Sequence, residues 1–258
     1  MDFGLRVLQA DAATPRVAFK GPGPDSPDSD QFSTIPLPVG GGIEGQTGYQ
    51  CNIDQDDCHL IVVDRGHGKL YEAYQANKTE NVLTANFVAV WDLNRVYPPS
   101  GRGEQCTSAD AAGFPIAPLL FNADELASGR INHAIRFILP NSRMREDVYV
   151  HPATHAGGPT SPPPAPPYGV HFRLKASYDV SQLKPAAQVV ARALQKYGMY
   201  LADGGNIALT AQSDLDTTAK YADFDFGSHD LRDLKVTDFE VVDLGTPIRV
   251  SYDCARNK

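Results

Sequence analysis

The apolar stretches of this sequence are short, and proline and glycine residues separate them. Leu60–Val63 and Phe87–Trp91 have the length of a β-strand, whereas a membrane helix needs roughly 18 consecutive apolar residues. The 258 residues include 20 prolines and 22 glycines, which place turn signals between these stretches. The pattern predicts a mainly β fold and no membrane-spanning segment.

Turn signals divide the sequence into predicted strands. Residues 60–64 and 69–75 flank the segment 65–68, Arg-Gly-His-Gly, which is typical of a hairpin, and residues 85–92 form a third strand. Further strands are expected at residues 131–138, 168–178, 236–242 and 248–252, and on both sides of a hairpin-type turn at 203–206. Such regular short strands favour a β-sandwich over an α/β fold.

Two helices are predicted among these strands. Residues 122–129 have an Asn cap, an acidic first turn and a Gly stop, which indicate a short helix. A long amphipathic helix begins near Ser181 or Pro185 and ends at Gly198. We therefore expect residues 51–258 to form one β-rich, jelly-roll-like domain. Because the chain from residue 11 onward is rich in Pro, Gly, Ser and Asp, residues 1–50 are expected to form an irregular N-terminal arm.

The charge balance limits the partners of the protein. Its net charge of −8 argues against nucleic acid, because phosphate binding needs a basic surface. The sequence has no Gly-x-Ser-x-Gly elbow, phosphate-binding loop or His-Glu-x-x-His motif. Serine hydrolase, nucleotide-dependent and zincin functions therefore lack support, and we expect no cofactor.

The cysteine content predicts secretion. An even number of cysteines, only 23 Lys and Arg residues, and many prolines and glycines suit an exported protein. Four cysteines allow three pairings. Cys51 and Cys58 bracket a short segment and suit a small disulfide loop, which would leave Cys106 for Cys254. A zinc site is disfavoured because no Cys-x-x-Cys spacing occurs, so no metal site is expected.

A row of basic side chains follows one predicted strand. Successive side chains of a strand point to opposite faces, so His171, Arg173 and Lys175 share one face. That face suits an anionic or hydroxyl-rich ligand, and it equally suits an ordinary solvated surface. His133 and Arg136, in the preceding strand, point to opposite faces.

Carboxylates near aromatic residues are the candidate catalytic groups. Glycoside hydrolysis needs one protonated and one ionised carboxyl group across the sugar. Glu72 and Asp92 are the predicted pair, with Asp64 and Asp110 in reserve and Asp203 at a further strand end. The predicted substrate-binding residues are Tyr71, Trp91, His133, Arg173 and Lys175.

Four motifs carry a resemblance to a known group of proteins. They are Leu-Tyr-Glu-Ala-Tyr (70–74), Ser-Ala-Asp-Ala-Ala-Gly-Phe-Pro-Ile (108–116), Gly-Arg-Ile-Asn-His-Ala-Ile-Arg-Phe (129–137) and Phe-Arg-Leu-Lys-Ala-Ser-Tyr-Asp (172–179). With them the chain resembles a family of uncharacterised secreted bacterial and fungal proteins over roughly residues 50 to 245. Some members carry carbohydrate-binding modules, which implies work on polysaccharides but assigns no catalytic residue.

These observations favour a secreted enzyme that hydrolyses a polysaccharide or oligosaccharide with two carboxylates. An alternative is a lyase on uronic-acid glycans, in which Arg173 and Lys175 hold the substrate carboxylate and His171, His133 or Tyr178 removes the proton. A third possibility is a carbohydrate-binding module without catalysis.

Overall fold

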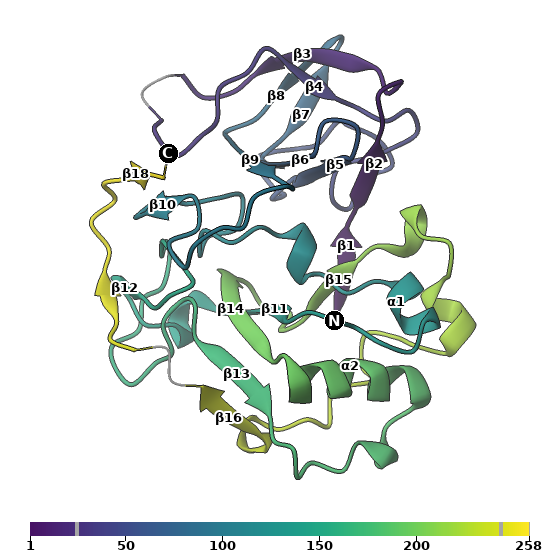
Figure 1. Cartoon of the computed structure of the whole chain (residues 1–258), viewed down its shortest axis with the longest axis vertical. Helices are drawn as coiled ribbons and strands as arrows, with labels where there is room; N and C mark the ends of the chain where they lie inside the picture. The colour runs from purple at the N-terminus through teal and green to yellow at the C-terminus, as the bar shows by residue number, and fades with distance from the viewer. Residues whose placement is uncertain (24–25, 243–244, 258) are drawn as a thin grey trace.

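The structure is a computed structural model that describes residues 1–23, 26–242 and 245–257 (Figure 1). Within these residues the strands form three four-stranded and three two-stranded sheets. The predicted β-rich class is therefore confirmed. No helix of the described residues combines the length and the apolar character that crossing a bilayer requires.

The central sheet is buried on both faces and has the strand order β2-β5-β6-β9. Its strands are β2 (Val7–Ala10), β5 (Leu60–Asp64), β6 (Lys69–Tyr74) and β9 (Phe87–Asp92). β5 and β6 form the predicted antiparallel hairpin, with Ile61 opposite Glu72. Alternate side chains enter two different apolar cores, because Leu60 and Val62 pack in one core and Ile61 in the other.

A second sheet forms the upper layer of the molecule in Figure 1. Its order is β4-β3-β8-β7, with β4 (Thr34–Pro36), β3 (Arg16–Lys20), β8 (Val82–Thr84) and β7 (Asn77–Thr79). The prediction of an irregular arm over residues 1–50 is wrong in this part, since β1 (Asp2–Leu5) to β4 all lie there. These strands have three to five residues and pair mostly with distant segments. The local sequence pattern therefore gave little indication of these strands.

The lower sheet has the order β11-β14-β13-β16 and packs with the long helix. Its strands are β11 (Ile135–Leu139), β14 (Met199–Gly204), β13 (His171–Leu174) and β16 (Phe239–Val242). Helix α2 (Pro185–Lys196) buries Val190 and Leu194 in the same core as β11 and β13. Helix α1 (Ala123–Ala127) begins at the predicted Asn122 cap, where Asn122 and Glu125 form a reciprocal capping box.

The predicted hairpin around residues 203–206 does not form. β14 has β11 on one edge and β13 on the other, so no edge is free for β15 (Thr210–Gln212). β15 instead pairs in parallel with β1. The pairs β2–β5, β3–β8 and β11–β14 are also parallel, which differs from the antiparallel pairing of a jelly roll.

Short elements complete the described chain. The remaining strands are β10 (Gly103–Glu104) with β18 (Ala255–Arg256), and β12 (Val148–Tyr149) with β17 (Ile248–Arg249). The 3₁₀ helices are η1 (Ala117–Leu119), η2 (Asn141–Arg143), η3 (Val180–Gln182), η4 (Asp214–Asp216), η5 (Tyr221–Phe224) and η6 (Val236–Asp238). The predicted strand 236–242 is thus a 3₁₀ turn followed by β16.

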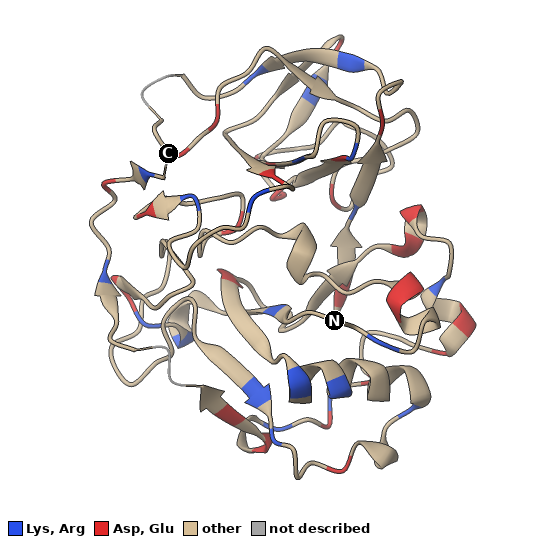
Figure 2. Ribbon diagram, viewed as in Figure 1, with Lys and Arg blue, Asp and Glu red and all other residues tan. Residues whose placement is uncertain are grey.

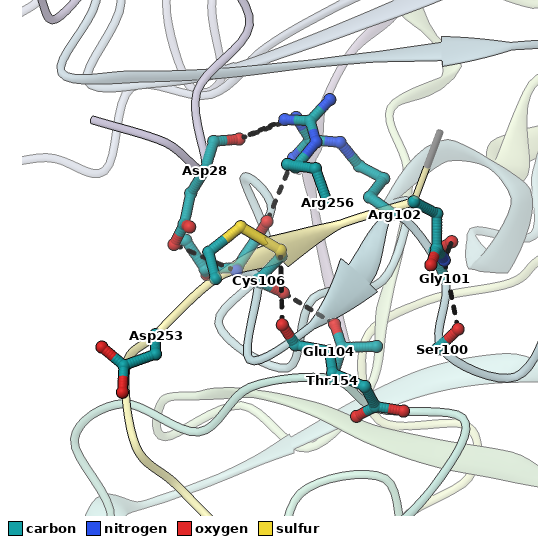
Figure 3. The surroundings of a disulfide bond; sticks show 12 residues. Asp28, Ser100, Gly101, Arg102, Glu104, Cys106, Thr154, Asp253 and Arg256 are labelled. Atoms are coloured by element: carbon teal, nitrogen blue, oxygen red, sulfur yellow. Dashed lines mark hydrogen bonds between the residues drawn. A yellow bond between two sulfur atoms is a disulfide. The ribbon is translucent and has the colours of Figure 1, made fainter. Parts of the chain in front are cut away.

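Two disulfides form, Cys51–Cys58 and Cys106–Cys254, which confirms the favoured pairing. The second ties the end of the chain to its middle (Figure 3). Next to it, Arg256 and Arg102 both donate to the backbone oxygen of Asp28, at 2.9 and 2.7 Å. Two disulfides are consistent with an extracellular location.

Candidate functional site

A pocket of about 610 Å³ opens between the central sheet and the lower sheet. The hairpin strand β6, the loop 107–111 and the turn after β14 all contribute to its walls. Polar and aromatic side chains dominate the lining, namely Asp57, His59, Tyr74, Phe87, Asn141, His155, Tyr168, Asp203 and Asn206. Clefts with several convergent polar groups are the usual location of ligand sites.

Asp203 is the titratable group at the centre of this site. It lies at the end of β14, and its side chain is 25% exposed. Its Oδ1 accepts from the backbone N–H of Gly204 at 2.8 Å, and its Oδ2 accepts from Arg136 Nη2 at 3.4 Å. Burial raises the pKa of Asp203, and the positive charges of Arg136 and His59 offset only part of that rise. Asp203 therefore keeps its proton to a higher pH than an ordinary aspartate.

Arg136 connects Asp203 to a second buried carboxyl group. The Arg136 side chain, 4% exposed, donates from Nε to Asp110 Oδ2 at 3.1 Å and from Nη1 to Thr210 Oγ1 at 2.9 Å. Burial raises the pKa of Asp110 to about 7; Arg136 opposes this rise and Asp203 adds to it. Within the described residues Asp110 Oδ1 has no hydrogen-bond partner. Two carboxyl groups thus share one guanidinium, which favours retention of a proton by one of them.

His59, in the pocket lining, forms an ion pair with Glu44. His59 Nδ1 lies 2.6 Å from Glu44 Oε2, and its Nε2 lies 3.0 Å from the backbone oxygen of Ala109. Burial acts to lower the pKa of His59, but the hydrogen bond and charge of Glu44 outweigh it and raise the pKa to about 9. His59 is consequently a cation at neutral pH, and Glu44 balances its charge.

Asp57 supplies the exposed carboxylate of the pocket. It comes from the loop that the Cys51–Cys58 disulfide closes, one residue before Cys58. Tyr74 Oη donates to Asp57 Oδ1 at 3.5 Å, a weak contact. Tyr74, Phe87 and Tyr168 give the pocket aromatic surface, and an aromatic ring offers a broad apolar face to a ligand.

The predicted pair Glu72 and Asp92 does not share this pocket. Glu72 is fully buried and accepts hydrogen bonds from Trp91 Nε1 at 2.9 Å and from the backbone N–H groups of Ile116 and Ala117, both at 2.8 Å. Burial raises its pKa to about 7, and these three hydrogen bonds limit the rise. Asp92 lies at the surface and pairs with Lys69 at 2.8 Å. The Glu72 carboxyl is therefore sealed from solvent, and the Asp92 carboxylate is already paired with Lys69.

The two reserve carboxyls have different surroundings. Asp64 is fully buried and pairs with His67 at 2.9 Å and Arg16 at 3.3 Å, so it stabilises the β5–β6 turn. Asp110 is the predicted carboxyl that the structure brings beside the pocket, through its contact with Arg136 and between the lining residues Ala109 and Ala111.

None of the predicted substrate-binding residues lines this pocket. Tyr71 and Trp91 are buried in the cores on either side of the central sheet. His133 pairs with Glu125 at 3.1 Å. In the basic row of β13 and the residue after it, Arg173 pairs with Glu240 of β16 at 2.7 Å, and Lys175 donates to the backbone oxygen of Thr237 in η6 at 2.7 Å. Figure 2 shows the basic band of β13 beside the acidic band of β16. This face is therefore better described as an ordinary solvated surface, the alternative given for it in the sequence analysis.

Sequence reasoning missed most of the pocket because its walls come from distant segments. Asp57 and His59 lie in the loop before β5, whereas Asn141, His155 and Tyr168 come from three other segments. One signal was present, since the aspartates between two cysteines directly precede the buried strand β5. Asp203 was recognised at its strand end, but nothing local indicated that Asp110 and Arg136 would join it.

The metal-binding capacity of the described residues is low. The group of potential ligand atoms found close together there is Asp28, Cys106 and Cys254, and both sulfurs belong to the disulfide. No thiolate is therefore offered, although thiolates are what a zinc site of this kind uses.

Comparison with known proteins gives the site no precedent. No protein-family model matches the chain, and neither a curated protein nor a solved structure matches it. The case for function therefore depends on the pocket.

Proposed function

We propose that this protein is a secreted enzyme that hydrolyses a polysaccharide, with Asp203 as the general acid and Asp57 as the second carboxylate. The observation that supports it is the contrast between two carboxyl groups that line one pocket. Asp203 is partly buried with a raised pKa, and Asp57 is exposed to solvent. Hydrolysis of a glycosidic bond requires this division, because one carboxyl protonates the leaving oxygen while the other stays ionised.

The surroundings of the two groups support the same reaction. Arg136, which is itself held by Asp110, donates a hydrogen bond to Asp203 and helps to orient it. Tyr74, Phe87 and Tyr168 supply aromatic surface for sugar rings. Arg136 and Asp110 belong to two of the motifs that resemble the secreted bacterial and fungal family, and we propose membership of that family on this basis. The two disulfides support export to an oxidising compartment.

A lyase has less support from the pocket. Elimination on a uronate needs a cation against the substrate carboxylate. Among the described residues the pocket lining contains no Lys or Arg, and the cation His59 in that lining already pairs with Glu44. Arg173 and Lys175, the cations expected for that role, contact β16 and η6 instead.

The proposal is tested with Asp203→Asn and Asp57→Asn. Proteins are incubated with a panel of neutral, cationic and uronic polysaccharides, and products are read by mass spectrometry. Each variant is expected to lose about 100-fold or more of the wild-type rate, the usual contribution of a positioned acid or base. The matched control is Asp92→Asn, a surface carboxyl outside the pocket, which is expected to keep full activity.

Unchanged far-ultraviolet circular dichroism and melting temperature exclude unfolding as the cause of a loss. If Asp203→Asn keeps the wild-type rate, Asp203 is not the general acid. Products with an unsaturated, ultraviolet-absorbing end group identify a lyase instead, and glycan binding without any product identifies a binding module.

A further inference from the structure

The disulfide-closed loop that contributes Asp57 to the pocket carries an excess of negative charge. The Cys51–Cys58 loop contributes Asp57 to the lining and also carries Asp54 and Asp56, all three exposed. In residues 1–23, 26–242 and 245–257, none of the three forms an ion pair with Lys, Arg or His. The Cys51–Cys58 disulfide closes the loop that carries these three carboxylates, and Asp57 among them lines the pocket.

The interior does not neutralise this charge. Glu44 balances the cation His59, and Arg136 balances one carboxyl while contacting two, Asp110 and Asp203. Among the residues that the structure describes, those that line the pocket include no Lys or Arg. The interior therefore supplies no excess positive charge to offset the three carboxylates of the loop.

We infer that the polysaccharide bound here is cationic, a polymer of amino sugars with free amino groups such as oligomers of glucosamine. This inference rests on the proposed function. Protonated amines gain favourable Coulomb energy beside unpaired carboxylates, and an acidic loop beside the pocket raises the local concentration of a cationic ligand. A uronic-acid polymer meets repulsion at the same loop, and a neutral glycan gains nothing from it.

The inference is tested by comparing oligomers of equal length that differ only in charge. Oligomers of glucosamine, of N-acetylglucosamine and of galacturonic acid are titrated into the wild-type protein at low temperature by calorimetry, at 50 and 500 mM salt, and their cleavage rates are measured in parallel. Binding of the glucosamine oligomer is expected to be at least tenfold tighter than that of the other two at 50 mM salt. Most of this difference is expected to disappear at 500 mM, because salt screens exposed charges.

A charge-removing variant of the loop isolates the cause. The double substitution Asp54→Asn/Asp56→Asn leaves the lining residues intact and is expected to weaken glucosamine binding threefold to tenfold at 50 mM salt without changing N-acetylglucosamine binding. The matched control, Asp147→Asn/Asp233→Asn, removes two exposed carboxylates outside the pocket and is expected to have no effect.

The outcomes separate this inference from the proposed function. Hydrolysis of neutral or uronic oligomers with equal or greater preference overturns the cationic substrate and leaves a hydrolase. Tight, salt-sensitive binding of glucosamine oligomers with no cleavage of any glycan retains the ligand class and overturns hydrolysis. An unchanged affinity in the loop variant refutes the role of the Cys51–Cys58 loop.

Discussion

Glu72→Gln is expected to change how the stability of the protein depends on pH. The carboxyl of Glu72 is fully buried among Ile61, Leu70 and Trp91 on the inner face of the central sheet. Its pKa is raised from 4.5 to about 7. Between these two values the folded protein binds a proton that the unfolded chain has already lost. The free energy of unfolding must therefore fall as the pH rises through this interval.

The size of the effect follows from the two pKa values. A difference between 4.5 and about 7 corresponds to about 3 kcal/mol, at about 1.4 kcal/mol for each pKa unit. Glutamine carries no ionisable group and lacks this dependence. Its amide N–H₂ would meet the Trp91 N–H donor, which costs about 1 kcal/mol at every pH. Relative to wild type, the variant should therefore gain about 3 kcal/mol between pH 4.5 and pH 8.

Urea denaturation at pH 4.5, 6 and 8, with both disulfides intact, measures this change. Asp92→Asn is the control, because the pKa of Asp92 is lowered by its hydrogen bond to Lys69, and its stabilising contribution is lost as the pH falls. A wild-type-to-variant difference that stays constant over this range would refute the reasoning. Glu72→Gln should also retain the hydrolytic activity that we propose, and loss of that activity in a stably folded variant would restore Glu72 as a candidate catalytic residue.

Two further predictions concern charge and covalent structure. The pKa of His59 is raised from 6.5 to about 9, so its stabilising contribution is complete below pH 6.5 and is lost as the pH rises to 9. Over that interval wild type should lose about 3 kcal/mol more than His59→Gln in urea denaturation, and parallel curves would contradict this. Cys106→Ser/Cys254→Ser removes a link across 148 residues and should cost roughly 5 kcal/mol of stability by loop entropy. Thermal unfolding measures that loss, and an unchanged melting temperature would contradict it.

The parts of the fold that were predictable are those specified by neighbouring residues. Alternation and turn residues located the β5–β6 hairpin, and the Asn122 cap located the start of α1. The parallel pairing of β1 with β15 joins residues about two hundred positions apart, and no local pattern specifies it. The pairing of β1 with β15 depends on the topology of the chain and not on the preferences of its residues.

The prediction of the catalytic residues was wrong for a related reason. Alternation along β6 puts Glu72 on one face of a strand, but it does not reveal that the segment around Ile116 and Ala117 covers that face. The local sequence around a carboxylate is the same whether the group opens into a groove or is covered by backbone N–H donors. Only the tertiary contacts distinguish Glu72, which is sealed, from Asp203, which opens into the pocket.

The pairing of β1 with β15 sets the order in which the molecule can mature. During synthesis, strand β1 is made long before β15 and has no partner until residues 210–212 have been made. Cys106 likewise waits for Cys254, four residues from the end of the sequence. A ribosome adds about 5–20 residues each second, so the nascent chain remains incomplete for several seconds or longer. Over that interval β1 and Cys106 lack the partners that they have in the folded protein.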